Sequence, residues 1–182
     1  MFRTTLYSLL LGVLSANAES ADPARFEHCF EEAASRHRVS ADLLRAIAKV
    51  ESSFNPIAVN GTHVERTKTK DIGLMQINTG NLRGLKKYGI SETHLYDPCV
   101  STDVGAWLLR ERIDRFGYTW EAVGSYNAAC TQLKGVECDR ARSLYARKVA
   151  RALNDLRRHA LPPQQVAVPV IQEITINARD RS

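Results

Sequence analysis

Glu51 is the residue whose surroundings in the sequence first suggest acid–base chemistry. It follows a segment in which apolar residues recur at helical spacing: Leu43, Leu44, Ile47, Val50 and Phe54. Because Glu51 lies one helical turn after Ile47, its carboxyl should border that apolar stripe. Desolvation can raise the pKa of a carboxyl in such a place, as a general acid working near neutral pH requires. The alternative is an ordinary solvated helix glutamate.

Two later segments carry residues suited to holding a polar polymer beside this carboxyl. Residues 73–78 read Gly-Leu-Met-Gln-Ile-Asn, and residues 125–128 read Ser-Tyr-Asn-Ala. Gly73 leaves room for a backbone or a sugar to approach closely, or it simply makes a turn. Together with Glu51-Ser52, and with Asp-Ile before the glycine and Asp-Pro-Cys at 97–99, these segments form a specific ordered set.

This order of motifs resembles the soluble lytic transglycosylase superfamily, glycoside hydrolase family 23, and especially its small exported VirB1-like and IagB-like members. Those members accompany secretion, conjugation and pilus machines. The resemblance covers roughly residues 26–150. It implies a lysozyme-like fold and cleavage of the MurNAc–GlcNAc β-1,4 bond of peptidoglycan, with formation of 1,6-anhydro-MurNAc ends. It implies no cofactor and no metal.

The resemblance makes Glu51 the sole catalytic acid and base. It gives supporting or substrate-binding roles to a set of residues around it: Ser52, Gly73, Met75, Gln76, Asn78, Tyr126 and Asn127. Tyr126 is expected to hydrogen-bond the Glu51 carboxyl and orient it, and Met75 and Gln76 to line the glycan subsites. Asn78 binds sugar or caps the next helix, and Ser52 supports Glu51 or the substrate.

The elements that must position these residues are nearly all helical. Helices are expected at 25–37, after a Ser40 cap up to Asn55-Pro56, and at 79–88, 99–116, 120–128 and 139–158. The last one should pack through an apolar stripe: Leu144, Tyr145, Val149, Leu153 and Leu156. Residues 57–72 are expected to be a loop or weak hairpin, with some β-character near Thr62 to Val64. The prediction is an all-α domain of the lysozyme-like α+β superfamily, with little or no sheet and a substrate cleft.

The two ends of the chain differ from this body. Residues 1–18 have the charged, apolar and small-residue regions of a secretory signal, with cleavage expected near Ala18. The domain is expected at 19–160, and the Pro-containing remainder, 161–182, is expected to be a flexible tail. No later stretch approaches the ~20 apolar residues of a transmembrane helix. We therefore expect an exported, periplasmic monomer with no membrane anchor.

The four cysteines are expected to form disulfides in an exported chain. Four cysteines allow three pairings, among which spacing alone does not choose; Cys29–Cys99 and Cys130–Cys138 are favoured. A zinc site is disfavoured because the chain has no Cys-x-x-Cys and its histidines are scattered. The bridge at Cys130 could also fix the bend where relatives often have glycine after Tyr-Asn-Ala.

The formal net charge is +5, and the basic excess is concentrated in arginines and a lysine late in the chain. No aromatic residues that could stack on bases accompany these arginines, so a nucleic-acid partner is not expected. The expected partners are peptidoglycan strands and components of a secretion, conjugation or pilus machine. Two alternatives remain open. One is a goose-type lysozyme-like hydrolase that uses Asp71 as a second carboxylate. The other is a non-catalytic peptidoglycan-binding assembly protein.

Overall fold

Helices dominate the computed structural model, which describes residues 23–130 and 133–160. The longer helices are α1 (Glu27–His37), α2 (Ala41–Ser52), α5 (Pro98–Phe116), α6 (Trp120–Asn127) and α7 (Gly135–Ala160). Shorter ones are η1 (Pro23–Phe26), α3 (Val64–Thr67), η2 (Thr79–Asn81), α4 (Leu82–Leu85), η3 (Lys86–Tyr88) and η4 (Thr93–Tyr96). The expected signal at 1–18 and tail at 161–182 lie outside the described residues. The mostly helical prediction is confirmed.

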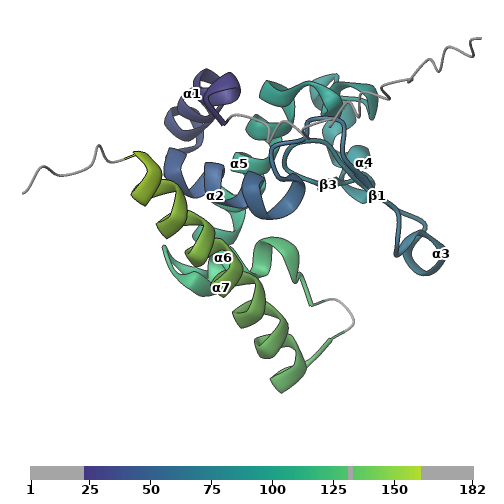
Figure 1. Cartoon of the computed structure of the whole chain (residues 1–182). Helices are drawn as coiled ribbons and strands as arrows, with labels where there is room; N and C mark the ends of the chain where they lie inside the picture. Colours follow the sequence, from purple (N-terminus) through teal and green to yellow (C-terminus); the bar gives the residue numbers. More distant parts are fainter. Residues whose placement is uncertain (1–22, 131–132, 161–182) are drawn as a thin grey trace, which may run out of the picture.

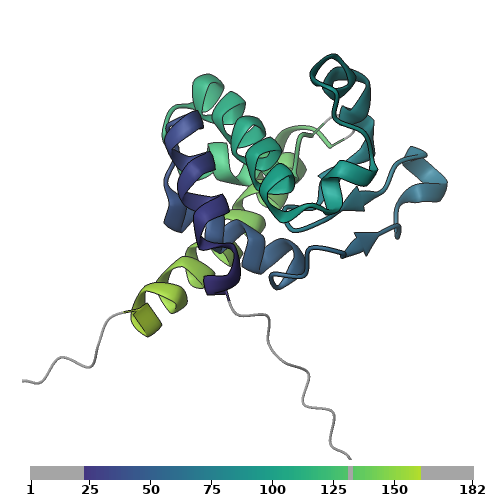
Figure 2. The same ribbon diagram turned by 90° about the horizontal axis from the view of Figure 1, so that it is seen from above.

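The helix that carries Glu51, α2, is enclosed by the other long helices. α5 packs against α1 and α6, while α7 packs along α6 and α2. In Figure 1, α7 runs diagonally across the lower part of the molecule, and Figure 2 shows α1 and α5 lying side by side. One core of buried apolar side chains joins these elements, including Phe30, Leu44, Ile47 and Leu109.

Side-chain caps fix where the long helices begin. The Ser40 hydroxyl accepts from the backbone N–H of Leu43, and the Asp97 carboxylate accepts from the first N–H groups of α5, whose first residue is proline. At the other end α2 stops at Ser52, slightly earlier than predicted. Ser53 and Phe54 are left-handed, with φ of 52° and 64°, and Phe54 turns into the core against Phe30.

A small antiparallel sheet lies beside the helices. Its strands are β1 (Val59–Asn60), β2 (Asp71–Ile72) and β3 (Ile77–Asn78), in the order β1-β2-β3. The β-character expected near Thr62 to Val64 was misplaced, because the strand comes earlier and Val64 begins α3. β1 and the chain that follows it up to β2, residues 59–70, form an arm that projects from the body (Figure 1). The single helix predicted for 79–88 is divided into η2, α4 and η3.

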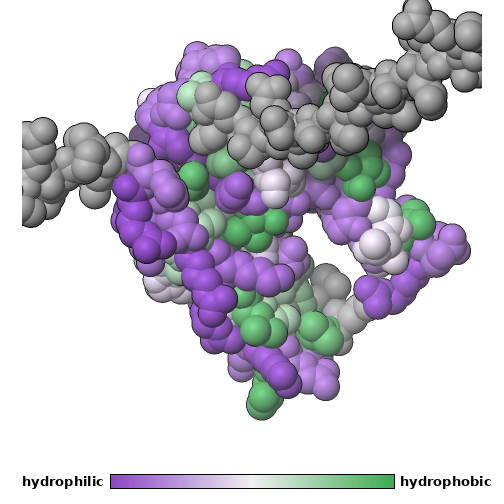
Figure 3. Space-filling view, viewed as in Figure 1, coloured by the Kyte–Doolittle hydropathy of each residue, from purple (hydrophilic) through white to green (hydrophobic). Residues whose placement is uncertain are grey.

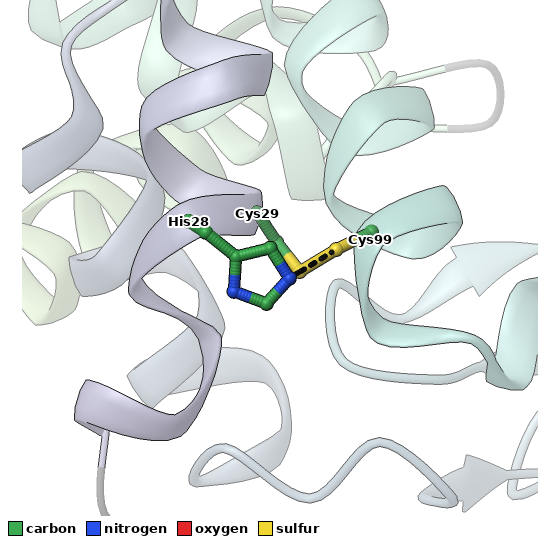
Figure 4. A group of neighbouring side chains, drawn as sticks. All are labelled: His28, Cys29 and Cys99. Carbon is green, nitrogen blue, oxygen red and sulfur yellow. Dashed lines mark hydrogen bonds between the residues drawn. A yellow bond between two sulfur atoms is a disulfide. The ribbon is translucent and has the colours of Figure 1, made fainter.

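Both favoured disulfides are present. Cys29–Cys99 joins α1 to α5, and Cys130–Cys138 joins the loop after α6 to α7, which begins at Gly135 rather than 139. His28 lies against the first bridge, with Nε2 3.3 Å from the Cys99 sulfur (Figure 4). Although His28, Cys29 and Cys99 are metal-ligand types, the two sulfurs are bonded to each other and are not free thiolates. Within the described residues, no helix is long and apolar enough to cross a membrane.

Candidate active site

Glu51 lies in a cleft of about 710 Å³ that the arm, α5 and the end of α6 enclose. The arm and sheet contribute mostly polar side chains, among them His63, Asp71, Gln76 and Asn78. The opposite wall is formed by Leu108 and Arg112 of α5, Tyr126 and Asn127 of α6, and the loop through Cys130. Figure 3 shows a hollow between the projecting arm and the body of the molecule. A cleft of this size that is open at its surface suits a polymer chain.

The Glu51 carboxyl has the protonation behaviour predicted from its position. Burial raises its pKa from 4.5 to about 7, and the negative charge of Asp71 acts in the same direction. A hydrogen bond from Tyr145 and the positive charge of Lys148 act in the opposite direction and keep the rise limited. The carboxyl is therefore protonated and ionised in comparable amounts near neutral pH. Such a group can both donate and accept a proton.

The tyrosine that contacts Glu51 is Tyr145, so the prediction of a Tyr126–Glu51 hydrogen bond was wrong. The Tyr145 hydroxyl donates to Glu51 Oε1 at 2.5 Å, whereas the Tyr126 hydroxyl donates to the backbone oxygen of Met75 at 3.0 Å. The reason is helix packing: α7 crosses α2 and brings Tyr145 next to the carboxyl, while Tyr126 points to the 73–78 segment. Burial raises the pKa of both hydroxyls, so both stay protonated donors.

Gly73 and Met75 shape the site from within the core. Gly73 has φ of +79°, and a Cβ there would lie 2.1 Å from the backbone oxygen of Leu95. The close approach that requires glycine is therefore between two backbones. Met75 is completely buried and packs on Gly105, so the predicted contact of its side chain with the glycan was wrong. Its apolar side chain fills the interior while its backbone holds Tyr126.

Gln76 and Asn78, by contrast, face the cleft as predicted. The Gln76 side-chain amide donates to the backbone oxygens of Ala58 and Gly73, which fixes its position at the sheet. Of the two roles considered for Asn78, the structure shows the helix cap. Its Oδ1 caps η2 by accepting from Gly80 N–H, while its side chain borders the cleft.

Ser52 and Asn127 complete the predicted set. The Ser52 hydroxyl donates to the backbone oxygen of Leu74 at 2.7 Å, so it ties α2 to the 73–78 segment and supports Glu51 indirectly. Asn127 lines the cleft at the C-terminal end of α6. The structure thus brings five of the predicted residues to one cleft: Glu51, Gln76, Asn78, Tyr126 and Asn127. The other three, Ser52, Gly73 and Met75, do not line the cleft but support the residues that do.

Sequence reasoning named Asp71 as a candidate second carboxylate but missed the contacts that it makes on the sheet side of the cleft. Asp71 Oδ1 accepts from the Asn78 amide at 2.7 Å, and Asp71 Oδ2 lies 3.7 Å from His63 Nε2. His63 comes from the arm, and its isolation in the sequence gave no sign that it would meet Asp71. The same reasoning assigned Arg112 no role, although this residue lines the opposite wall.

Comparison with known proteins identifies the family and the fold of the chain. The transglycosylase SLT domain model matches residues 28–142, more than half of the chain. Invasion protein IagB of Salmonella typhimurium (strain SL1344) is 38% identical over 144 residues, which cover 79% of this chain and 82% of IagB. Protein IpgF of Shigella sonnei is 42% identical over 110 residues, which cover 60% of this chain and 70% of IpgF.

A solved structure of an inactive mutant of the lytic transglycosylase Slt from Pseudomonas aeruginosa has the same fold. Its TM-score is 0.56 at 21% sequence identity, and the match covers 75% of this chain but only 25% of that longer one. The resemblance inferred from the motifs is thereby confirmed. The chain belongs to the transglycosylase SLT domain family and is a peptidoglycan lytic transglycosylase.

Proposed function

We propose that Glu51 alone supplies both proton transfers of a non-hydrolytic cleavage of the MurNAc–GlcNAc β-1,4 bond. The protonated carboxyl donates to the bridging oxygen, so the bond from that oxygen to C1 of MurNAc breaks and GlcNAc leaves with a new 4-hydroxyl. The C6 hydroxyl of the same MurNAc then attacks C1 and gives its proton to the Glu51 carboxylate. The products are a 1,6-anhydro-MurNAc end and a regenerated acid.

The observation that carries this proposal is the single carboxyl with a pKa of about 7 in a polar cleft. A group half protonated near neutrality is present in each form that the two steps need. The attacking hydroxyl is attached to the substrate, and tethered nucleophiles reach effective molarities of ~10⁵ M or more, so no second carboxylate has to activate water. The Tyr145 hydroxyl stabilises the Glu51 carboxylate by a hydrogen bond after Glu51 has donated its proton.

A hydrolytic reaction with Asp71 as a water-activating base is the second candidate, because Asp71 lines the same cleft and its charge raises the Glu51 pKa. The contacts of Asp71 favour a bracing role instead. Asn78 donates to one of its oxygens, His63 lies near the other, and its backbone is held within the sheet. These contacts leave the carboxylate oriented towards protein partners rather than free for a water molecule.

The test is a digest of purified peptidoglycan with the wild type, Glu51→Gln and Asp71→Asn, followed by mass spectrometry of the muropeptides. We expect anhydro ends, which lack one water relative to reducing ends, from the wild type and from Asp71→Asn, and none from Glu51→Gln. Reducing ends from the wild type that vanish in Asp71→Asn would establish the hydrolase instead. Anhydro products that persist unchanged in Glu51→Gln would refute the role of Glu51.

We further propose that the enzyme is exported to the periplasm and opens the wall locally for a secretion, conjugation or pilus apparatus. The similarity to the protein named invasion protein IagB supports this setting. N-terminal sequencing of the mature protein should show cleavage near Ala18. In a strain lacking the gene, the wild type should restore assembly of the machine and Glu51→Gln should not. A Glu51→Gln protein that restores assembly would favour a non-catalytic binding role.

A further inference from the structure

Arg112 differs from the other partly buried arginines of the described chain. Four arginines in residues 23–130 and 133–160 are partly buried: Arg45, Arg110, Arg112 and Arg142. Arg45 pairs with Asp42, Arg110 with Asp114, and Arg142 with Glu121. Across the same described residues, Arg112 has no hydrogen bond or ion pair. Shielding a guanidinium from water without a counter-charge is unfavourable unless a ligand supplies that charge.

The position of Arg112 connects this unmatched charge with the reaction site. Arg112 lines the cleft together with Leu108, which lies four residues earlier and hence on the same face of α5. Its charge acts to lower the pKa of the Tyr126 hydroxyl, against the effects of burial and of Glu51 and Asp71, so it lies near Tyr126. The cleft therefore has a wall on which an apolar side chain and a free cation are adjacent.

We infer that Arg112 and Leu108 form a subsite for the lactyl arm of the muramoyl residue and a carboxylate carried on it. This inference rests on the proposed glycan substrate. The lactyl methyl group matches Leu108, and a guanidinium fork binds a carboxylate through two parallel hydrogen bonds. The carboxylate has two sources with the same chemistry. In stripped strands it is the free end of the lactyl group, and in intact peptidoglycan it belongs to the attached stem peptide.

Three substrates separate these sources. The first consists of glycan strands from which an amidase has removed the stems, leaving lactyl carboxylates. The second consists of the same strands after the carboxyls have been converted to methylamides with carbodiimide and methylamine. The third is peptidoglycan with intact stems. Each is digested by the wild type, Arg112→Gln, Arg112→Lys and a control, Arg115→Gln. Arg115 is exposed on the same helix and does not line the cleft. Its variant therefore removes the same charge as Arg112→Gln without changing the cleft.

We expect Arg112→Gln to lose roughly 10-fold or more in kcat/KM on strands with lactyl carboxylates, because charge-assisted hydrogen bonds to a ligand are strong. On the methylamide strands it should cut at the rate of the wild type. Arg112→Lys should recover part of the loss, and Arg115→Gln should behave like the wild type on every substrate. A loss confined to intact peptidoglycan would assign the carboxylate to the stem peptide.

An equal loss by Arg112→Gln on all three substrates, or no loss on any, would overturn the inference. The wild type provides a test that does not depend on how a variant folds: it should prefer carboxylate strands to methylamide strands, and added salt should reduce that preference. Equal rates on both, together with no loss by Arg112→Gln on intact peptidoglycan, also count against the subsite. These outcomes are distinct from failure of the proposed reaction, which is judged by whether the wild type forms anhydro ends.

Discussion

Single residues decide how the carboxyl of Glu51 behaves. Partial burial removes water from it and raises its pKa, Asp71 adds to this effect, and Tyr145 and Lys148 oppose it. The resulting pKa of about 7 depends on three elements. α2 supplies the acid, β2 supplies a negative charge, and α7 supplies a hydrogen-bond donor and a positive charge. Changing one neighbour should therefore move the pH dependence in a direction that is known in advance.

Tyr145→Phe should move the alkaline limb of the kcat/KM profile to higher pH. Tyr145 stabilises the ionised carboxylate, so removing its hydroxyl raises the pKa of Glu51 further and keeps the acid protonated to higher pH. The rate at the optimum should fall about 10-fold, because the carboxyl also loses its orienting contact. The measurement is kcat/KM between pH 4 and 9, a range that spans the Glu51 pKa of about 7 on both sides.

Asp71→Asn should move the alkaline limb of the kcat/KM profile to lower pH. Removing the negative charge favours the ionised form of Glu51, lowers its pKa and shortens the pH range in which the acid is protonated. Tyr126→Phe is the control for both variants, because Tyr126 donates to the Met75 backbone rather than to Glu51. It should leave the limb in place and lower the free energy of unfolding by about 1 kcal/mol. Shifts of the same sign in Tyr145→Phe and Asp71→Asn would contradict this electrostatic description.

The residue that the sequence could not identify is Tyr145. It lies on the apolar stripe of the last helix, four residues before the buried Val149, and this pattern correctly indicated a core position. Nothing in the spacing shows that the stripe packs across the carboxyl of a residue 94 positions earlier. Met75 shows a second limit, because an apolar residue within a motif segment can be either a core residue or a substrate contact, and spacing does not distinguish the two. The raised pKa of Glu51 was predictable because its helical context is local.

At the scale of elements, caps and periodicity were enough to predict the long helices. Ser40 was predicted to cap α2 and the structure confirms this start, while Asp97 and Thr119 are seen to cap α5 and α6. The sheet was not predictable in detail, because each strand has only two residues and so shows no alternation. Its pairing is fixed instead by contacts of the 73–78 segment with the helices, which bring Ile72 and Ile77 into the core.

Gly73→Ala should be strongly destabilising, because it affects how this segment docks. The added Cβ would meet the backbone oxygen of Leu95, and φ of +79° is unfavourable for alanine. We expect the free energy of unfolding to fall by about 3 kcal/mol or more. Gly84→Ala is the matched control, since nothing lies within 4 Å of its added Cβ and it is inside α4. Gly84→Ala should be neutral or stabilise the protein by about 0.5–1 kcal/mol, as measured by urea unfolding.

For the whole molecule, the two disulfides should contribute unequally to stability. Cys29–Cys99 spans 70 residues and Cys130–Cys138 spans 8. In the chain-entropy model these loops correspond to about 4 and about 2.5 kcal/mol. Replacing both cysteines of the first pair with serine should therefore lower the unfolding midpoint more than replacing those of the second. The second pair should instead affect cleavage, because Cys130 lines the cleft and is left-handed, with φ of 58°.

A digest of peptidoglycan measured beside urea unfolding separates the two effects. If removal of the Cys130–Cys138 bridge changes stability but leaves kcat/KM untouched, the bridge does not shape the cleft. If removal of the Cys29–Cys99 bridge costs less than removal of the other, the folded state must contain an opposing strain or the unfolded state residual order.

The partial burial of Glu51 also affects the proton balance of folding. Between pH 4.5 and about 7 the native state holds a proton at Glu51 that the unfolded chain has released. The free energy of unfolding therefore declines as pH rises through this interval, and the full deficit, about 3 kcal/mol, is present above it. Glu51→Gln, which cannot ionise, should unfold at higher urea than the wild type at pH 8 but at nearly the same urea at pH 4. The carboxyl that we propose as the catalytic acid therefore lowers the stability of the protein most at the alkaline end of its titration.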